Sequence, residues 1–318
     1  MPFLWLNFLK LVAKMDEKTL TKDTILYLEE EFKNEKLDIS SFFNNVRKNH
    51  LPIEMALIYN YILENCKQNK LLNQTIREIN KNKFIQNFEP LLDFILTTND
   101  LELKVLAIKT IPVFKNTKAT EVLLACLRDK NSNYKIRFAA ADALGKIGDV
   151  NAFETLGNIV CDEEENSAYI KESAVVALGN IGDKRALDVF STILSSKKMF
   201  LDKFSYLKER VVEAISKLDV SKEDKAYEIL QKSILEPSKN VRISSIEALM
   251  NLDTPKSYDL IYDRLIYDDD LEVRKNAIIA LYNISDVKIL KEVVEGDFPF
   301  ELKEFAQELI IDYEDEDE

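Results

Sequence analysis

Side chains able to do catalysis or to hold a metal are few and scattered in this chain. His50 is the single histidine among 318 residues, so a serine or cysteine nucleophile has no other histidine as its base. Cys66, Cys126 and Cys161 are too few and too far apart for a disulfide framework or a metal cluster, and we expect buried free thiols in a reducing compartment. The chain contains no Gly-x-x-x-x-Gly-Lys, Gly-x-Gly-x-x-Gly or His-Glu-x-x-His motif. We therefore expect no catalytic residue, no cofactor and no metal site.

The net charge of the chain limits the classes of partner that it can bind. The formal net charge is −13, of which residues 1–100 carry −1 and residues 101–318 carry −12. Acidic clusters occur at residues 162–165, 268–270 and 314–318, either as solvated loops and a disordered tail or as a surface for a basic partner. Binding to a phosphate backbone needs concentrated Lys and Arg, so we expect no nucleic-acid binding.

A repeated motif sets the organisation of the chain. It runs from an apolar residue and a cation, through small residues three apart, to an Asp or Asn eleven or twelve residues after the cation. The closing residues follow one another at intervals of 33, 34, 36, 34 and 33. The copies are Leu103-Lys104 to Asn116, Ile136-Arg137 to Asp149, Ile170-Lys171 to Asp183, Leu207-Lys208 to Asp219, Val241-Arg242 to Asp253, and Val273-Arg274 to Asp286. A fixed period in this range is typical of a solenoid, in which each unit packs only on its neighbours.

Each repeat reads as two amphipathic helices. Alanines three apart on the second helix predict close packing between helices, and Pro112 predicts a shortened helix in the first copy. Gly145, Gly148, Gly179 and Gly182 are expected to end helices. The cation and the closing Asp are expected to bond each other or to cap helices along the stack.

The segment Ile-Arg-x-x-Ala-Ala-x-Ala-Leu-Gly-x-Ile-Gly-Asp at 136–149 resembles HEAT repeats, and most closely the short subclass named after phycobilisome lyases. The resemblance covers about residues 88–311. It implies an all-α, armadillo-type fold: a right-handed α-solenoid of stacked antiparallel helix pairs. We expect a helical N-terminal region without a clear motif at 1–85, the repeat array at 86–311 and an acidic disordered tail at 312–318.

The resemblance implies several functions, which the residues separate only in part. HEAT-repeat di-iron hydroxylases need several His-Glu pairs, which this chain lacks, and HEAT-like DNA glycosylases line a groove with cations. A non-catalytic scaffold for a protein or peptide is the first hypothesis. A bilin lyase or phycobiliprotein chaperone is the alternative, and a glycosylase-like protein is disfavoured by the acidic charge.

The first residues, 1–13, are apolar and include Phe3, Trp5, Phe8 and Leu11. The segment is shorter than the roughly 20 residues that a spanning helix needs and has no cationic start, so we expect neither a secretory signal nor a membrane span. It reads either as a helix packed on the solenoid or as a peripheral membrane or partner contact. We expect a cytoplasmic protein.

The candidate binding surface follows from aligning the copies on the cation. Positions one and five after it share a helix face, and in a HEAT-like stack the second helices line the inner, concave side. These positions mix acidic and apolar side chains, which suits a partner with basic and apolar residues. The predicted partner-binding residues are Phe138, Asp142, Glu172, Val176, Glu209, Glu213, Ile243, Glu247 and Ile279.

Overall fold

A computed structural model describes residues 20–195, 205–220, 224–252, 254–285 and 287–316. The apolar segment 1–13, most of the long linker 195–206 and the closing residues Asp253 and Asp286 lie outside these ranges. The expectations for them stay predictions.

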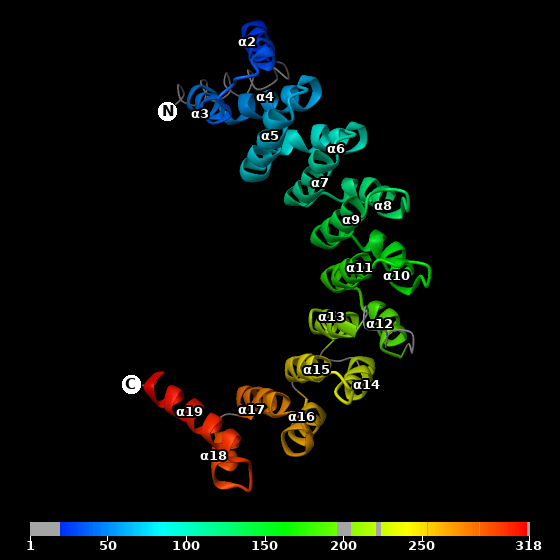
Figure 1. The fold of residues 1–318 in the computed structure, drawn as a ribbon, viewed down its shortest axis with the longest axis vertical. Coiled ribbons are helices and arrows are strands. Elements are labelled where there is room, and N and C mark those ends of the chain that lie inside the picture. The colour runs from blue at the N-terminus through cyan, green and yellow to red at the C-terminus, as the bar shows by residue number, and fades with distance from the viewer. Residues whose placement is uncertain (1–19, 196–204, 221–223, 253, 286, 317–318) are drawn as a thin grey trace, which may run out of the picture. The chain divides into compact units, whose positions relative to one another are not determined.

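Every regular element in the described ranges is a helix, which confirms the expected all-α class (Figure 1). The first part of the chain contains α2 (Lys22–Lys33), α3 (Ile39–Asn49), α4 (Pro52–Asn65), α5 (Asn69–Asn82), η1 (Ile85–Asn87), α6 (Phe88–Thr97), α7 (Leu101–Thr110), η2 (Ile111–Phe114), η3 (Thr117–Ala119), α8 (Thr120–Arg128) and α9 (Tyr134–Ile147). It continues with η4 (Val150–Ala152), α10 (Phe153–Cys161), α11 (Ala168–Ile181), α12 (Ala186–Ser195), α13 (Ser205–Ser216), α14 (Asp224–Ser233), α15 (Lys239–Leu252), α16 (Pro255–Tyr267), α17 (Leu271–Ser285), α18 (Lys288–Glu295) and α19 (Phe300–Glu316).

The chain divides into two units, Met1–Ile147 (unit 1) and Gly148–Glu318 (unit 2). In unit 2, α10 pairs with α11, α16 with α17 and α18 with α19. The second helices α11, α13, α15 and α17 pack on one another in order, and the first helices α10, α12 and α14 do the same (Figure 1). Unit 1 follows the same rule, because α8 pairs with α9 while α5, α7 and α9 pack in order. Each unit is therefore a stack of helix pairs, as the repeat predicted.

Pro112, Gly148 and Gly182 mark helix ends where the sequence indicated. The α7 helix stops at Thr110, and Pro112 lies in the 3-10 turn that follows. Proline offers no N–H to an α-helical hydrogen bond, which accounts for the change. Gly148 and Gly182 both have φ of +77°, the left-handed conformation of a helix C-terminus.

Gly145 and Gly179 do not end helices, so the expectation for them was wrong. Both are buried inside α9 and α11. A Cβ added at Gly179 would lie 2.9 Å from Cβ of Ala214 on α13. This glycine therefore serves the close approach of two second helices rather than a turn.

The alanines of the motif form the core of the stack. Ala140, Ala174, Ala214, Ala248 and Ala277 are each at most 2% exposed. Side chains this small let the second helices pack at short separations. The leucines and isoleucines beside them, such as Leu178 and Leu249, are fully buried and supply most of the apolar burial.

Helices also form at the two ends of the array, outside the clear copies of the motif. In unit 1, α4 packs on α6 and α5 packs on α7, the same arrangement as in the later pairs, although residues 1–85 carry no recognisable motif. At the other end α19 runs to Glu316, into the segment expected as a disordered tail. No glycine or proline follows Ile311 to stop the helix. The expected boundary at residue 85 stays a prediction.

Candidate partner-binding surface

The cation that recurs in each copy of the motif has a structural role in both units. Arg137 Nε donates to the carbonyl oxygen of Leu127 at 2.9 Å, at the end of α8. Arg274 Nε donates to the carbonyl oxygen of Leu265 at 2.7 Å, at the end of α16. Carbonyls in the last turn of a helix have no partner within it, and a cation there also favours the helix dipole. The cations therefore cap the first helix of their own pair.

Lys171 caps in the same way from a buried position. Its Nζ atom donates to the carbonyl oxygens of Val160 at 3.0 Å and Asp162 at 2.6 Å, at the end of α10. The residue is only 3% exposed, and burial holds the pKa of its ammonium group below the ordinary value. A lysine so enclosed has no free charge to offer a ligand, and we assign it to the structure of the stack.

Two cations reach the neighbouring pair. Lys208 Nζ lies 2.8 Å from Glu236 Oε2, in the residues that follow α14. Arg242 makes two bonds of 2.9 Å to the carboxylate of Asp268, the C-cap of α16. The partner carboxylates of Lys208 and Arg242 thus belong to the end of the next first helix, not to the closing Asp of their own copy. These bonds set the register between successive pairs.

The closing aspartates begin the next first helix instead. Asp149 accepts a hydrogen bond from the backbone N–H of Asn151 at 3.0 Å. Asp183 accepts from the N–H of Arg185 at 2.9 Å and also from the Arg185 side chain, which is the main cause of the lowered pKa of Asp183. The expectation that the closing residue caps a helix is confirmed at Asp149, the N-cap of η4, and Asp183 makes the same contact in the turn before α12.

We call the predicted residues of unit 2 the second-helix face: Glu172, Val176, Glu209, Glu213, Ile243, Glu247 and Ile279. They lie on α11, α13, α15 and α17, which pack in that order. None is buried: Glu247 and Ile279 are exposed, and the other five are half-buried. The remaining predicted residues, Phe138 and Asp142, are half-buried on α9 in unit 1, where Asp142 pairs with Lys146 at 2.7 Å.

Arg210 changes the charge of this face, and the sequence analysis missed it. Its Nε atom lies 3.2 Å from Glu172 Oε1 on α11, and its Nη1 atom lies 2.5 Å from Glu213 Oε2 on its own helix. Two of the predicted acidic residues are therefore held by one guanidinium group. The other copies carry Leu106, Ala139, Ser173, Ser244 and Asn276 at this position, two after the cation. An arginine at this position in only one copy was the available signal.

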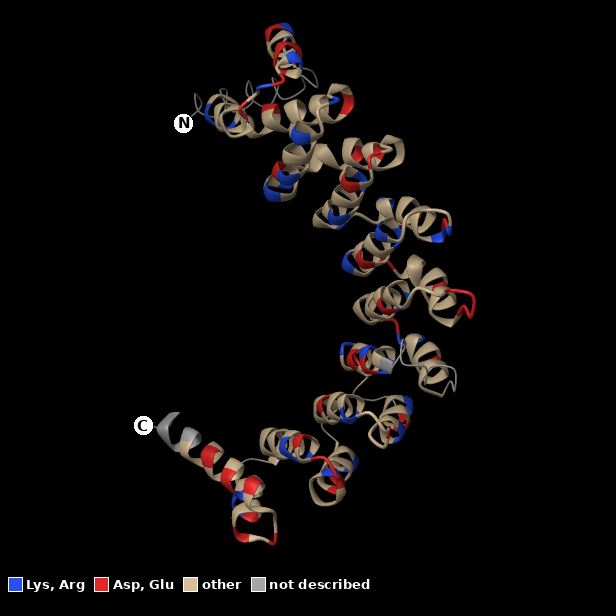
Figure 2. Cartoon of the chain, in the orientation of Figure 1, with Lys and Arg blue, Asp and Glu red and all other residues tan. Residues whose placement is uncertain are grey.

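Glu209 and Glu247 remain as acids for which the described residues offer no hydrogen bond or ion pair. Both lie on the face beside apolar side chains, with Ile243 one turn before Glu247 on α15. Figure 2 shows that acidic and basic residues alternate with uncharged ones along α13 and α15. Lys275, at the matching position of α17, has its Nζ 4.9 Å from the ring centre of Phe305. The two acids of the second-helix face that make no ion pair among the described residues thus lie on α13 and α15.

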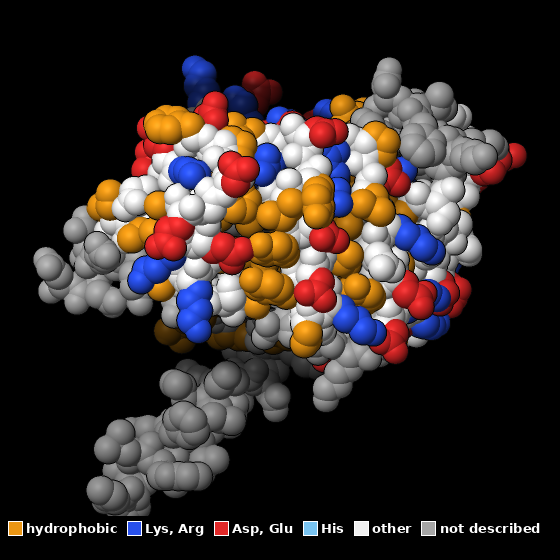
Figure 3. Space-filling view, turned by 90° about the horizontal axis from the view of Figure 1, so that it is seen from below, with side chains coloured by type: hydrophobic (Ala, Val, Ile, Leu, Met, Phe, Trp, Pro, Cys, Tyr) orange, Lys and Arg blue, Asp and Glu red, His pale blue; other side chains and the backbone are white. Residues whose placement is uncertain are grey.

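A second apolar area lies on the last helix pair. Phe300 is 73% exposed and Ile311 is 50% exposed, both on α19. Seen from below, hydrophobic side chains gather in short rows between acidic and basic ones (Figure 3). Among the described residues, no further helix pair packs on α18 and α19, which accounts for this exposure.

The other candidate groups carry no site in the described ranges. Cys66 is buried as expected, but Cys126 is only half-buried and Cys161, the last residue of α10, is exposed; all three are free thiols. No group of three or more His, Cys, Asp and Glu side chains there is arranged to hold a metal ion. No described helix has both the length and the hydropathy to cross a bilayer.

Family models agree with the architecture. The model described as HEAT repeats matches residues 88–166 and 198–282, more than half of the chain. The model described as a PBS lyase HEAT-like repeat matches residues 170–195. The chain belongs to the HEAT-repeat family. No curated protein matches it.

Solved structures with a similar fold come from varied proteins. The complex of CpcE and CpcF of phycocyanin lyase from Nostoc sp. PCC7120 is 22% identical, with a TM-score of 0.45, over 71% of this chain and 87% of that chain. Human deoxyhypusine hydroxylase in complex with glycerol is 15% identical, with a TM-score of 0.36, over 81% and 96%. An engineered protein is 18% identical, with a TM-score of 0.48, over 80% and 82%. At such values these structures carry no functional argument for this chain.

Proposed function

We propose that this chain is a non-catalytic scaffold of the HEAT-repeat family that binds a protein or peptide partner on the second-helix face. The observation that carries the proposal is the placement of Glu209 and Glu247 on neighbouring helices beside the half-buried Ile243. Solenoids use such extended surfaces for binding because successive repeats present the same helix side by side. The matching partner segment carries basic side chains between apolar ones.

Arg210 refines which residues contact the partner. Glu172 and Glu213 already face a guanidinium group, so a basic partner would have to compete with Arg210 for them. A basic side chain of the partner could approach Glu209 and Glu247 without replacing an ion pair of this chain. Electrostatic attraction at these two positions would steer the partner, and Val176, Ile243 and Ile279 would supply apolar contacts. Phe138 and Asp142 of unit 1 stay candidates for the same partner.

The test is photo-crosslinking in the native cell. A photoreactive benzoylphenylalanine is placed at Val176, Ile243 or Ile279, and in a control at Gln231, an exposed position of the first helix α14. We expect the same protein, identified by mass spectrometry, to be captured from the second-helix positions and not from Gln231. Capture from Gln231 alone, or different proteins from each position at background level, would contradict the proposal.

The match of residues 170–195 to a PBS lyase HEAT-like repeat favours one second candidate, the handling of a bilin or of a phycobiliprotein. The test is co-expression with a phycobiliprotein subunit and a bilin. Covalent or fluorescent bilin on the subunit only in the presence of this chain would support it. Absence of any bilin signal, with both proteins soluble, would leave the scaffold.

The acidic charge also supports a proposal on partners. We propose that the chain does not bind nucleic acid, since residues 101–318 carry a net charge of −12. We also propose a cytoplasmic location, where free cysteines stay reduced. Duplex DNA or RNA binding at micromolar concentration and physiological salt would contradict this. The peripheral contact through residues 1–13 stays an alternative, tested by sedimentation with anionic vesicles.

A further inference from the structure

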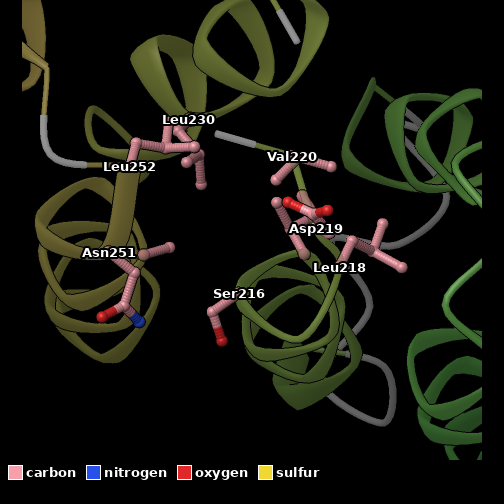
Figure 4. Close-up of a pocket in the computed structure, with 9 residues that line it drawn as sticks. Ser216, Leu218, Asp219, Val220, Leu230, Asn251 and Leu252 are labelled. Carbon is pink, nitrogen blue, oxygen red and sulfur yellow. The ribbon is translucent and has the colours of Figure 1, made fainter. Parts of the chain in front are cut away.

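A small cavity lies between the C-terminal ends of α13 and α15, under α14 (Figure 4). Its volume is about 120 Å³. Ser216 and Asn251 lie on either side of the gap, Leu230 and Leu252 lie together at its α14 end, and Asp219 comes from the loop after α13 (Figure 4).

The position that brings α11 into close contact with α13 carries a different residue where α13 meets α15. In the earlier pair Gly179, eight residues after its cation, faces Ala214 on the next second helix at near-contact distance. The corresponding residues in the next pair are Ser216 and Ala248, and both line the cavity. Serine adds a Cβ and a hydroxyl where the glycine had none. The cavity lies beside this serine.

The buried part of the cavity lining is apolar, whereas Ser216, Asp219 and Asn251 make the rest of it polar. Leu218, Leu230, Ala248 and Leu252 are between 0% and 7% exposed. The hydroxyl of Ser216 donates to the carbonyl oxygen of Glu213 at 2.7 Å, so it is turned to its own helix rather than to the cavity. The space here suits a branched aliphatic group of four or five carbons.

One carboxylate stands at the cavity without a partner. Asp219 is exposed, and no described residue donates a hydrogen bond to it or pairs with it. The neighbouring cation, Lys217, is directed to Asn180 Oδ1 on α11 at 3.5 Å. Asn251 adds an exposed amide at the same edge. An apolar space with an unpaired carboxylate at its edge matches an aliphatic group that bears or adjoins a positive charge.

We propose that this cavity is an anchor pocket for an aliphatic side chain of the partner, a leucine or isoleucine that adjoins a lysine or arginine. The basic group lies on Asp219 while the aliphatic group occupies the space lined by Leu218, Leu230 and Ala248. The pocket lies at the C-terminal ends of the helices that carry Glu209, Glu213 and Glu247. The biological role of the pocket rests on the proposed function, but ligand binding to the pocket can be measured with a small molecule alone.

The experiment uses the full chain with ¹³C-labelled Ile, Leu and Val methyl groups. Three probes of one shape and different charge are titrated: 3-methylbutylamine, 3-methylbutanol and 3-methylbutanoate. We expect saturable shifts at Ile215, Leu218 and Leu252, with the amine binding about two- to fivefold more tightly than the alcohol and the carboxylate most weakly. In Asp219→Asn the amine and the alcohol should bind equally, whereas Glu228→Gln on α14 should leave their difference unchanged.

Filling the cavity provides the second control. Ala248→Leu should abolish the methyl shifts for all three probes. If that variant does not fold, Ser216→Met serves, since the next copy carries Met250 at the same position. Equal binding of the three probes, shifts that persist in the filled variant, or no saturable shift would each overturn the proposal. A negative result here together with positive crosslinking at Ile243 would reject the pocket and leave the scaffold function intact.

Discussion

The Nε atom of Arg210 on α13 lies 3.2 Å from Oε1 of Glu172 on α11. This pair joins two successive second helices and removes part of the negative charge of the surface that we propose for binding. It therefore separates the acids of the second-helix face into two that are held within the protein and two, Glu209 and Glu247, that remain for a partner.

Replacing Arg210 by glutamine should strengthen binding of a basic peptide. The substitution leaves Glu172 and Glu213 without their cation, so the face gains a full negative charge, and the salt dependence of binding should steepen. The melting temperature should change little, because half-exposed ion pairs contribute little to stability. Fluorescence anisotropy with a labelled Leu-Lys-rich peptide at two salt concentrations checks this, and weaker binding by the variant would contradict it.

Gly179→Ala and Gly157→Ala should have opposite effects on stability. An alanine in a helix interior is ordinarily favoured over glycine by about 0.5–1 kcal/mol. At Gly157 the new Cβ would meet only Val189 Cγ2 at 3.5 Å, so Gly157→Ala should gain about that amount. At Gly179 the contact with Ala214 is 2.9 Å, and overpacking should cost about 1–3 kcal/mol. Urea unfolding of both variants measures this, and a gain at Gly179 would show that α11 and α13 are farther apart than described.

Ala174→Leu should destabilise unit 2 and Ala140→Leu should destabilise unit 1, each by about 1–3 kcal/mol. Both alanines are fully buried on second helices, so the added atoms have no free space. Leucine at Ser195, an exposed position at the end of α12, is the control and should have little effect. Unchanged melting of both core variants would show that the alanines are not at helix contacts.

Arg242→Met should cost about 3 kcal/mol, because it leaves the carboxylate of Asp268 buried without its main partner. Asp268 has a side chain that is only 3% exposed, although Arg264 remains 3.8 Å away. Adding Asp268→Leu should recover part of the loss, since the stranded charge is then gone while the carbonyl oxygens of Glu236 and Pro237 still lack the Arg242 donor. Lys239→Met, which removes the more exposed pair with Glu272, is the control and should cost much less. A double variant no more stable than Arg242→Met would contradict this account of the buried pair.

Asp183 should make the stability of unit 2 sensitive to acid. The hydrogen bonds from Arg185 hold the pKa of this carboxyl below its ordinary value in the folded chain. A depressed folded-state pKa gives a contribution that is present above the unfolded pKa and is lost as the pH falls through the folded value, below about pH 4. Asp183→Asn keeps an acceptor for the backbone cap and removes the charge. The difference in melting temperature between the wild type and this variant should be constant from pH 7 to about pH 5 and should then shrink, and a difference that grows on acidification would contradict the assignment.

The sequence predicted the helices and their packing better than it predicted the electrostatics of the surface. Cations such as Arg137 recur at one position of every copy, so their structural role could be inferred from one chain. Their partners could not, because Glu236 and Asp268 belong to the end of a neighbouring helix and are not part of the motif. Arg210 was missed for a related reason: its contact with Glu172 depends on the register of α13 against α11, across the copy with the 36-residue interval.

Glycine shows the same limit in a different form. Gly148 and Gly182 adopt positive φ, which the Gly-Asp pair at a helix end predicts. Gly145 and Gly179 lie within the same short segments, yet their role is close packing, which only the arrangement of neighbouring helices reveals. Ser216, which lines the cavity, occupies the position of Gly179 in the next copy, and a comparison of the copies points to it once the contact between Gly179 and Ala214 is known.

The most direct test of the proposed function is the affinity for the partner captured by crosslinking, measured with paired charge reversals. Glu209→Lys with Glu247→Lys changes the two unpaired acids of the second-helix face, and Glu228→Lys with Asp259→Lys makes the same change of charge on the first helices α14 and α16. Isothermal titration calorimetry at physiological salt, with circular dichroism to confirm folding, should show a loss of about tenfold or more for the first pair and less than about twofold for the control. Equal losses in the two double variants, or no loss in either, would contradict the claim that this chain binds its partner through the second-helix face.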